Sequence, residues 1–111
     1  MRYCLITPEM TSLAEAEWHD AGSSGKDVGA MVKSLLKCDY AEHVRVFFGG
    51  KYVSMFVDED GIAGGLSENP IATDIYHENV RVHDPKQLLD APSIYGPAVL
   101  LNVNLRPIEG R

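Results

Sequence analysis

The chain has 111 residues, of which 45% are hydrophobic and 23% charged, so it is long enough for one hydrophobic core and too short for two. Its net charge of −6 lacks the basic surplus of proteins that grip phosphate backbones, which argues against nucleic acid as a partner. The sequence shows no run of roughly 18 apolar residues and no secretory signal, so we expect a cytoplasmic protein without membrane contact.

The first part of the chain is predicted to form two strands and a helix. Residues 2–7 read as a strand that Pro8 stops, and residues 13–19 alternate apolar and polar side chains as a half-buried strand does. Residues 13–19 also contain good helix formers, which leaves a helix as the alternative. Ser24 and Asp27 resemble a capping box before a helix. The apolar residues behind them follow helical spacing: Val28, Met31, Val32, Leu35 and Leu36.

The next two predicted strands, residues 43–48 and 51–57, form a hairpin. Gly49 and Gly50 fit a two-residue turn, because glycine readily adopts the positive φ that such a turn needs. The turn pairs Phe48 with Lys51 and so places alternate residues on one face. One face is apolar and should meet the core: Val44, Val46, Phe48, Val53, Met55 and Val57. The other face is mixed: His43, Arg45, Phe47, Tyr52, Ser54 and Phe56.

A second helix and a last strand follow the hairpin. Asn69 and Pro70 predict a helix start, because asparagine caps exposed N–H groups and proline lacks one. Asp84 and Pro85 repeat this pattern before a short helical turn that ends near residue 90. After residues 96–97, the last strand turns a further apolar set toward the core: Val99, Leu101, Val103 and Leu105.

Together these elements predict one α+β domain over residues 1–107. The order β-β-α-β-β-α-β indicates a single, mostly antiparallel sheet of about five strands with both helices on one face. Residues 108–111 read I-E-G-R, which is the recognition sequence of a processing protease, and we assign them no function.

The most distinctive motif is an acidic-glycine turn followed by G-L-x-x-N-P and a helix. It comprises residues 57–61, Gly65, Leu66, Asn69, Pro70, Ala72 and Tyr76, and a closing strand over residues 96–100. In these residues the chain resembles a domain family of unknown function found in bacteriophages, prophages and plasmids. The resemblance is specific over residues 52–102. It implies an accessory protein of a mobile element that binds a host or phage protein, and it carries over no catalytic residue.

Motifs for catalysis and metal binding are incomplete. A calcium loop with Gly61 as its sixth residue would need an acid where Phe56 stands, and no H-E-x-x-H or G-x-S-x-G motif occurs. Cys4 and Cys38 lack the short spacing of a structural metal site. The four histidines (His19, His43, His77 and His83) are interpreted as ordinary surface residues. We therefore predict a protein that is not an enzyme and has no metal or cofactor.

The mixed face of the hairpin is the best candidate for a binding site. Tyr, Phe and Arg are enriched in binding hot spots, and exposed apolar patches mark partner surfaces. We expect it to contact a protein partner, or a second copy of the chain in a homodimer. The sequence leaves open the other interpretation, in which further elements cover this face and make it a second small core. The candidate residues are His43, Arg45, Phe47, Tyr52 and Phe56.

The glycine-rich loop and the second helix start suggest an alternative function, the binding and sequestration of a nucleotide or cyclic nucleotide. The N–H groups at a helix start attract anions. However, neither phosphate-loop fingerprint occurs, and Glu68 would repel a phosphate. The residues that would hold the phosphate are Gly64, Gly65, Ser67, Asn69 and Thr73.

Overall fold

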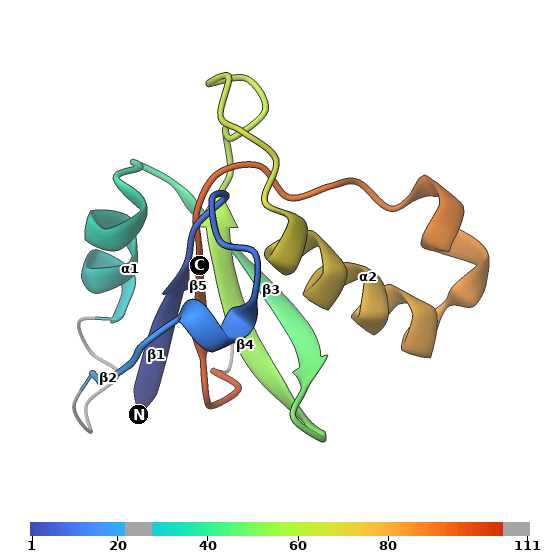
Figure 1. The fold of residues 1–111 in the computed structure, drawn as a ribbon, viewed down its shortest axis with the longest axis horizontal. Helices are drawn as coiled ribbons and strands as arrows, with labels where there is room; N and C mark the ends of the chain where they lie inside the picture. The colour runs from blue at the N-terminus through green and yellow to red at the C-terminus, as the bar shows by residue number, and fades with distance from the viewer. Residues whose placement is uncertain (22–27, 106–111) are drawn as a thin grey trace, which may run out of the picture.

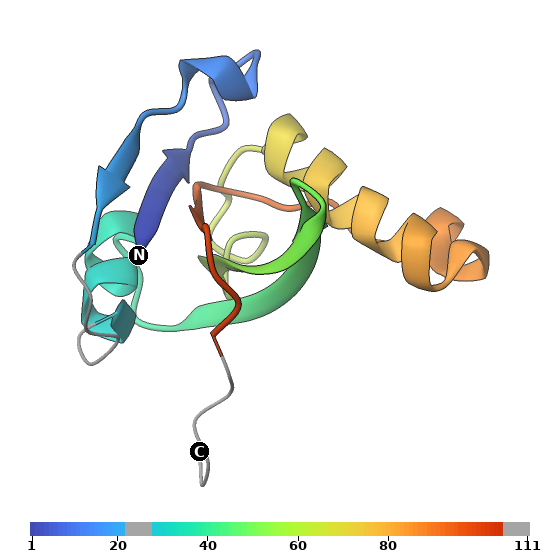
Figure 2. The ribbon, with the colours of Figure 1, turned by 90° about the horizontal axis from the view of Figure 1, so that it is seen from below.

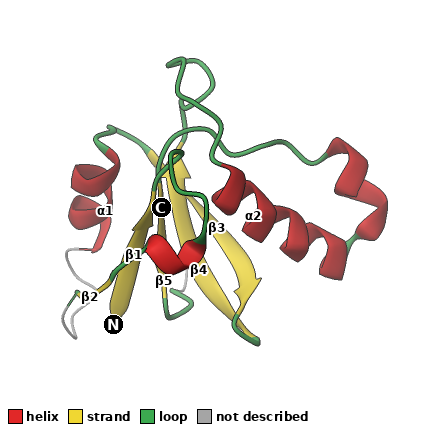
Figure 3. Ribbon diagram, in the orientation of Figure 1, coloured by secondary structure: helices red, strands yellow, loops and turns green. Residues whose placement is uncertain are grey.

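The computed structural model describes residues 1–21 and 28–105, and it confirms the predicted element order. The strands are β1 (Arg2–Ile6), β2 (Trp18–Asp20), β3 (Ala41–Phe48), β4 (Lys51–Asp58) and β5 (Ala98–Leu101). The α-helices are α1 (Val28–Leu36) and α2 (Pro70–His83), and two 3-10 helices are η1 (Leu13–Glu15) and η2 (Pro85–Asp90) (Figures 1 and 3). No helix within the described ranges combines the length and apolarity that a membrane span requires.

All five strands belong to one antiparallel sheet in the order β2-β1-β5-β4-β3. The hairpin register is the predicted one, with Phe48 opposite Lys51 and Phe47 opposite Tyr52. Gly49 and Gly50 have φ values of 62° and 81°, as the two-residue turn requires. In this order β5, the last strand of the described residues, lies in the middle of the sheet, between β1 and β4.

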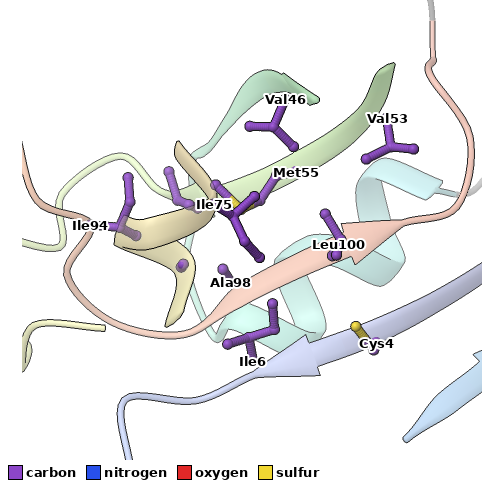
Figure 4. Close-up of a cluster of buried hydrophobic side chains, with 11 residues drawn as sticks. Cys4, Ile6, Val46, Val53, Met55, Ile75, Ile94, Ala98 and Leu100 are labelled. Atoms are coloured by element: carbon purple, nitrogen blue, oxygen red, sulfur yellow. The ribbon is translucent and has the colours of Figure 1, made fainter. Parts of the chain in front are cut away.

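The two helices cover opposite faces of the sheet, so the prediction that both lie on one face is wrong (Figure 2). Leu100 packs in one cluster with Ile75 of α2, as Figure 4 shows. Leu101 packs in a second cluster with Val28, Val32 and Leu36 of α1. The expectation of a single core is wrong for the same reason. All four residues of β5 are fully buried, and such an apolar run needs cover on both faces.

The predicted strand over residues 13–19 is only partly correct. Leu13–Glu15 is a 3-10 helix, and the strand is restricted to Trp18–Asp20. A capping box explains the difference: Ser12 Oγ accepts from the Ala14 N–H, and Glu15 Oε1 accepts from the Ser12 N–H at 3.1 Å. The capping box proposed for residues 24 and 27 lies outside the described residues.

The buried side chain of Asn69 joins three elements. Its Nδ2 donates to the carbonyl oxygens of Ile6 and Gly96, each at 2.9 Å. Its Oδ1 accepts from the Ala72 N–H at 3.1 Å, which is the predicted helix cap, and its own N–H donates to the Ile94 carbonyl at 2.7 Å. The end of β1, the entry to β5 and the start of α2 are thus held at one point.

A pair of leucine substitutions tests whether β5 is buried on both faces. Leu100→Ala and Leu101→Ala should each lower the free energy of unfolding by about 2–5 kcal/mol, because each removes a buried side chain. Leu89→Ala is the control, since Leu89 is 96% exposed, and it should change stability by less than about 0.5 kcal/mol. Urea denaturation measures all three. A Leu101→Ala variant as stable as the control would contradict the two-sided core.

Asn69→Ala should lower the free energy of unfolding by about 2–4 kcal/mol, because it removes a helix cap and leaves two buried carbonyl groups without their donor. Asn104→Ala, at an exposed asparagine, is the matched control and should be nearly neutral. The measurement is again urea denaturation. A loss below about 1 kcal/mol would mean that the Asn69 amide does not hold the three elements together.

Candidate functional site

Tyr52 is the centre of a surface cluster at the turn end of the β3–β4 hairpin. Its ring and that of Phe47 form a T-shaped pair with centroids 5.2 Å apart, and the Arg45 guanidinium carbon lies 4.9 Å from the Tyr52 centroid. The His83 ring stacks on Tyr52, and a 2.7 Å hydrogen bond joins the Tyr52 hydroxyl to Nε2 of His83. Phe47 and Tyr52 are half-buried, whereas Arg45 and His83 are exposed. We call these four residues the hairpin surface.

The other two residues of the predicted site, His43 and Phe56, lie apart from this cluster. Their rings stack with centroids 4.9 Å apart, and Nε2 of His43 lies 2.8 Å from Oγ of the buried Ser54. Phe56 packs against the cluster that α1 covers, and the Leu105 N–H donates to Ser54 Oγ. The mixed face is therefore divided: its Phe56 end belongs to the second core, and its Tyr52 end remains at the surface.

His83 belongs to the hairpin surface although the sequence interpretation treated it as an ordinary surface histidine. It is the last residue of α2 and lies 31 residues from Tyr52. No spacing rule relates a helix end to a strand at that separation, so the sequence held no local signal for this contact.

The residues of the alternative phosphate site do not converge on one point. Gly64, Gly65 and Ser67 are exposed in the loop, whereas Asn69 and Thr73 are buried. The Asn69 amide is committed to the contacts described above, and Thr73 Oγ1 accepts from the Ile94 N–H at 2.8 Å. At this helix start Pro70 has no N–H and the Ala72 N–H is capped, which removes two of the donors that a phosphate would use.

A groove runs along β3, the outermost strand of the sheet on that side. Its volume is about 430 Å³, and one wall is formed by residues 42–45 of β3. Tyr76 of α2 and residues 92–95 form the opposite wall, and the turn residues Asp58 and Glu59 close one end. We call it the edge groove. Arg45 lines it and also contacts Tyr52, so the edge groove adjoins the hairpin surface.

The two cysteines are poorly placed for nucleophilic chemistry. Cys4 is fully buried, and burial raises the pKa of its thiol to about 11. The Cys38 pKa is raised by burial and by the nearby carboxylates of Asp58 and Asp39. A raised pKa leaves little thiolate near neutral pH, and thiolate is the reactive form. Within the described ranges, no group of three or more His, Cys, Asp or Glu side chains is arranged to hold a metal ion.

Neither family models, nor curated proteins, nor solved structures give a match to this chain. The resemblance to the phage and plasmid family therefore stays a prediction based on the motif residues.

Alkylation with iodoacetamide at pH 8 should distinguish the two thiols. The half-buried Cys38 should react in the folded protein, whereas the fully buried Cys4 should react only after unfolding in urea. Mass spectrometry of peptides from native and unfolded samples measures both sites. Equal labelling of Cys4 and Cys38 in the folded protein would show that β1 does not bury its thiol as described.

Proposed function

We propose that this chain is a non-enzymatic binding protein that contacts a partner protein through the hairpin surface. The observation that supports this most is the arrangement around Tyr52, which has Phe47, Arg45 and His83 all in direct contact with its ring. Tyrosine and arginine dominate binding hot spots because they combine large contact areas with polar groups that fix orientation.

The hairpin surface is also held in place before binding. The Tyr52 ring is stacked on the His83 ring, and its hydroxyl is hydrogen-bonded to Nε2 of His83. The Tyr52 side chain therefore has little conformational entropy left to lose when a partner binds. Neither Phe47 nor Tyr52 belongs to the two hydrophobic clusters of the fold. Their removal should therefore affect binding more than folding.

The resemblance of residues 52–102 to a phage, prophage and plasmid family supports an accessory protein of a mobile element. In this proposal it acts in the host cytoplasm and its partner is a host or phage protein. A second copy of the chain is the other partner that an aromatic cluster on the surface of a small domain would fit.

Replacing Phe47 and Tyr52 together by alanine should weaken partner binding at least about thirtyfold, which corresponds to the loss of about 2 kcal/mol at a hot spot. Affinity capture from a host lysate, quantified by mass spectrometry, compares this double variant with the wild type. Tyr40→Ala is the matched control, because Tyr40 is 64% exposed and lies outside the hairpin surface. Light scattering on the same proteins reports whether the lost partner is a second copy.

Two results would count against the proposal. The double variant could unfold, which a melting temperature far below that of Tyr40→Ala would reveal, and the cluster would then be structural. Alternatively, the double variant could capture the same proteins as the wild type and have the same mass by light scattering. The hairpin surface would then not be the binding surface.

A further inference from the structure

The edge groove has a shape that suits an extended chain. It touches four consecutive residues of β3, 42–45, and also Val57 of the neighbouring strand β4, which lies opposite Glu42. Four strand residues cover about 13 Å at roughly 3.3 Å each. A second hollow of about 290 Å³, between α2 and η2, shares Tyr76 and Pro92 with the groove and so lies next to it.

The wall opposite β3 is fixed in place by buried hydrogen bonds. The Ile94 carbonyl accepts from the Asn69 N–H at 2.7 Å, and the Ile94 N–H donates to Thr73 Oγ1 at 2.8 Å. Tyr95 forms an isolated antiparallel β-bridge with Glu68. The Tyr95 carbonyl packs so closely on Gly61 that a Cβ at position 61 would lie 2.5 Å from its oxygen. A groove between such walls exists before any ligand arrives, which lowers the entropic cost of binding.

The charged side chains that line the groove are mainly negative. Glu42, Asp58 and Glu59 line it, and Asp90 lines the adjoining hollow. Within the part of the chain that the structure describes, none of these four carboxylates forms an ion pair; the pair that occurs joins Arg81 and Glu78.

The cationic side chain in the groove is directed elsewhere. Arg45 lines the end away from the acidic turn, and its guanidinium lies over the Tyr52 ring. The groove thus has an acidic end and an apolar middle, where Val44, Ile94 and Tyr76 lie. Lysine or arginine side chains at the acidic end, with apolar side chains between the walls, would complement this pattern.

We propose that the edge groove binds an extended segment of a partner protein that carries lysine or arginine residues next to apolar ones. This inference rests on the proposed function, because it specifies the chemistry of the same protein partner at a second surface. The basic residues would meet Glu42 and Glu59, and the apolar residues would lie against Val44, Tyr76 and Ile94. Arg45 would link this segment to contacts at the hairpin surface.

A short synthetic peptide in which lysine and valine alternate is the probe, and a peptide with glutamate in place of lysine is its counterpart. Fluorescence anisotropy should show binding of the lysine peptide alone, weakening as salt rises. Glu42→Gln with Glu59→Gln should reduce its affinity about tenfold or more. Glu9→Gln with Glu17→Gln, at two exposed glutamates away from the groove, is the control: it changes the net charge equally and should leave the affinity unchanged.

Nuclear magnetic resonance locates the peptide. Backbone amide shifts at Val44, Tyr76 and Ile94 should change on titration of the lysine peptide into the wild type and not into the groove variant. Equal loss of affinity in both double variants would mean general attraction to an acidic protein and would overturn the inference. The lysine peptide could instead fail to bind, while the Phe47→Ala and Tyr52→Ala double variant no longer captures the partner protein. That result would overturn this inference and leave the proposed function intact.

Discussion

The rest of the structure depends on one buried amide, that of Asn69. Its hydrogen bonds reach Ile6 and Gly96, which lie 63 and 27 residues away, and cap the helix that begins beside it. The same residue holds Ile94 through its backbone N–H. In a buried environment these groups have no water to replace a lost partner, so the three segments must meet at this point. The edge groove inherits its rigid wall from that junction.

Much of the fold could be predicted because its signals are local. The Gly49 and Gly50 turn determines which hairpin residues face each other, and Asn69 with Pro70 marks the start of α2. The position of the helices on the two faces was not predictable in this way. It depends on β5 lying between β1 and β4, a pairing between segments that are far apart in the sequence. The uninterrupted apolar run of β5 was the available hint that both of its sides are covered.

The candidate site could be predicted in part for the same reason. Alternation along β3 and β4 brings Arg45, Phe47 and Tyr52 to one face, and they do form a cluster. The contribution of His83 and the packing of Phe56 against the second cluster depend on how α2 and α1 are placed, which no local pattern specifies. From the sequence, loop residues 64–67 and the start of α2 were predicted to contact one phosphate together. They separate because Asn69 and Thr73 turn inward to bind the backbone.

The central position of β5 has a consequence for biosynthesis. The β1–β2 pair and the β3–β4 hairpin form the two sides of the sheet, and Ala98–Leu101 is the strand that joins them. During synthesis, β1 and β4 each have an unpaired edge until residues 98–101 emerge from the ribosome. Both hydrophobic clusters also lack their β5 side chains until then. Exposed apolar surface and unpaired strand edges make such incomplete chains prone to aggregation. Folding of the whole sheet is therefore expected to be a single event that waits for β5, and chains that lack residues 98–101 should be poor at reaching a native state.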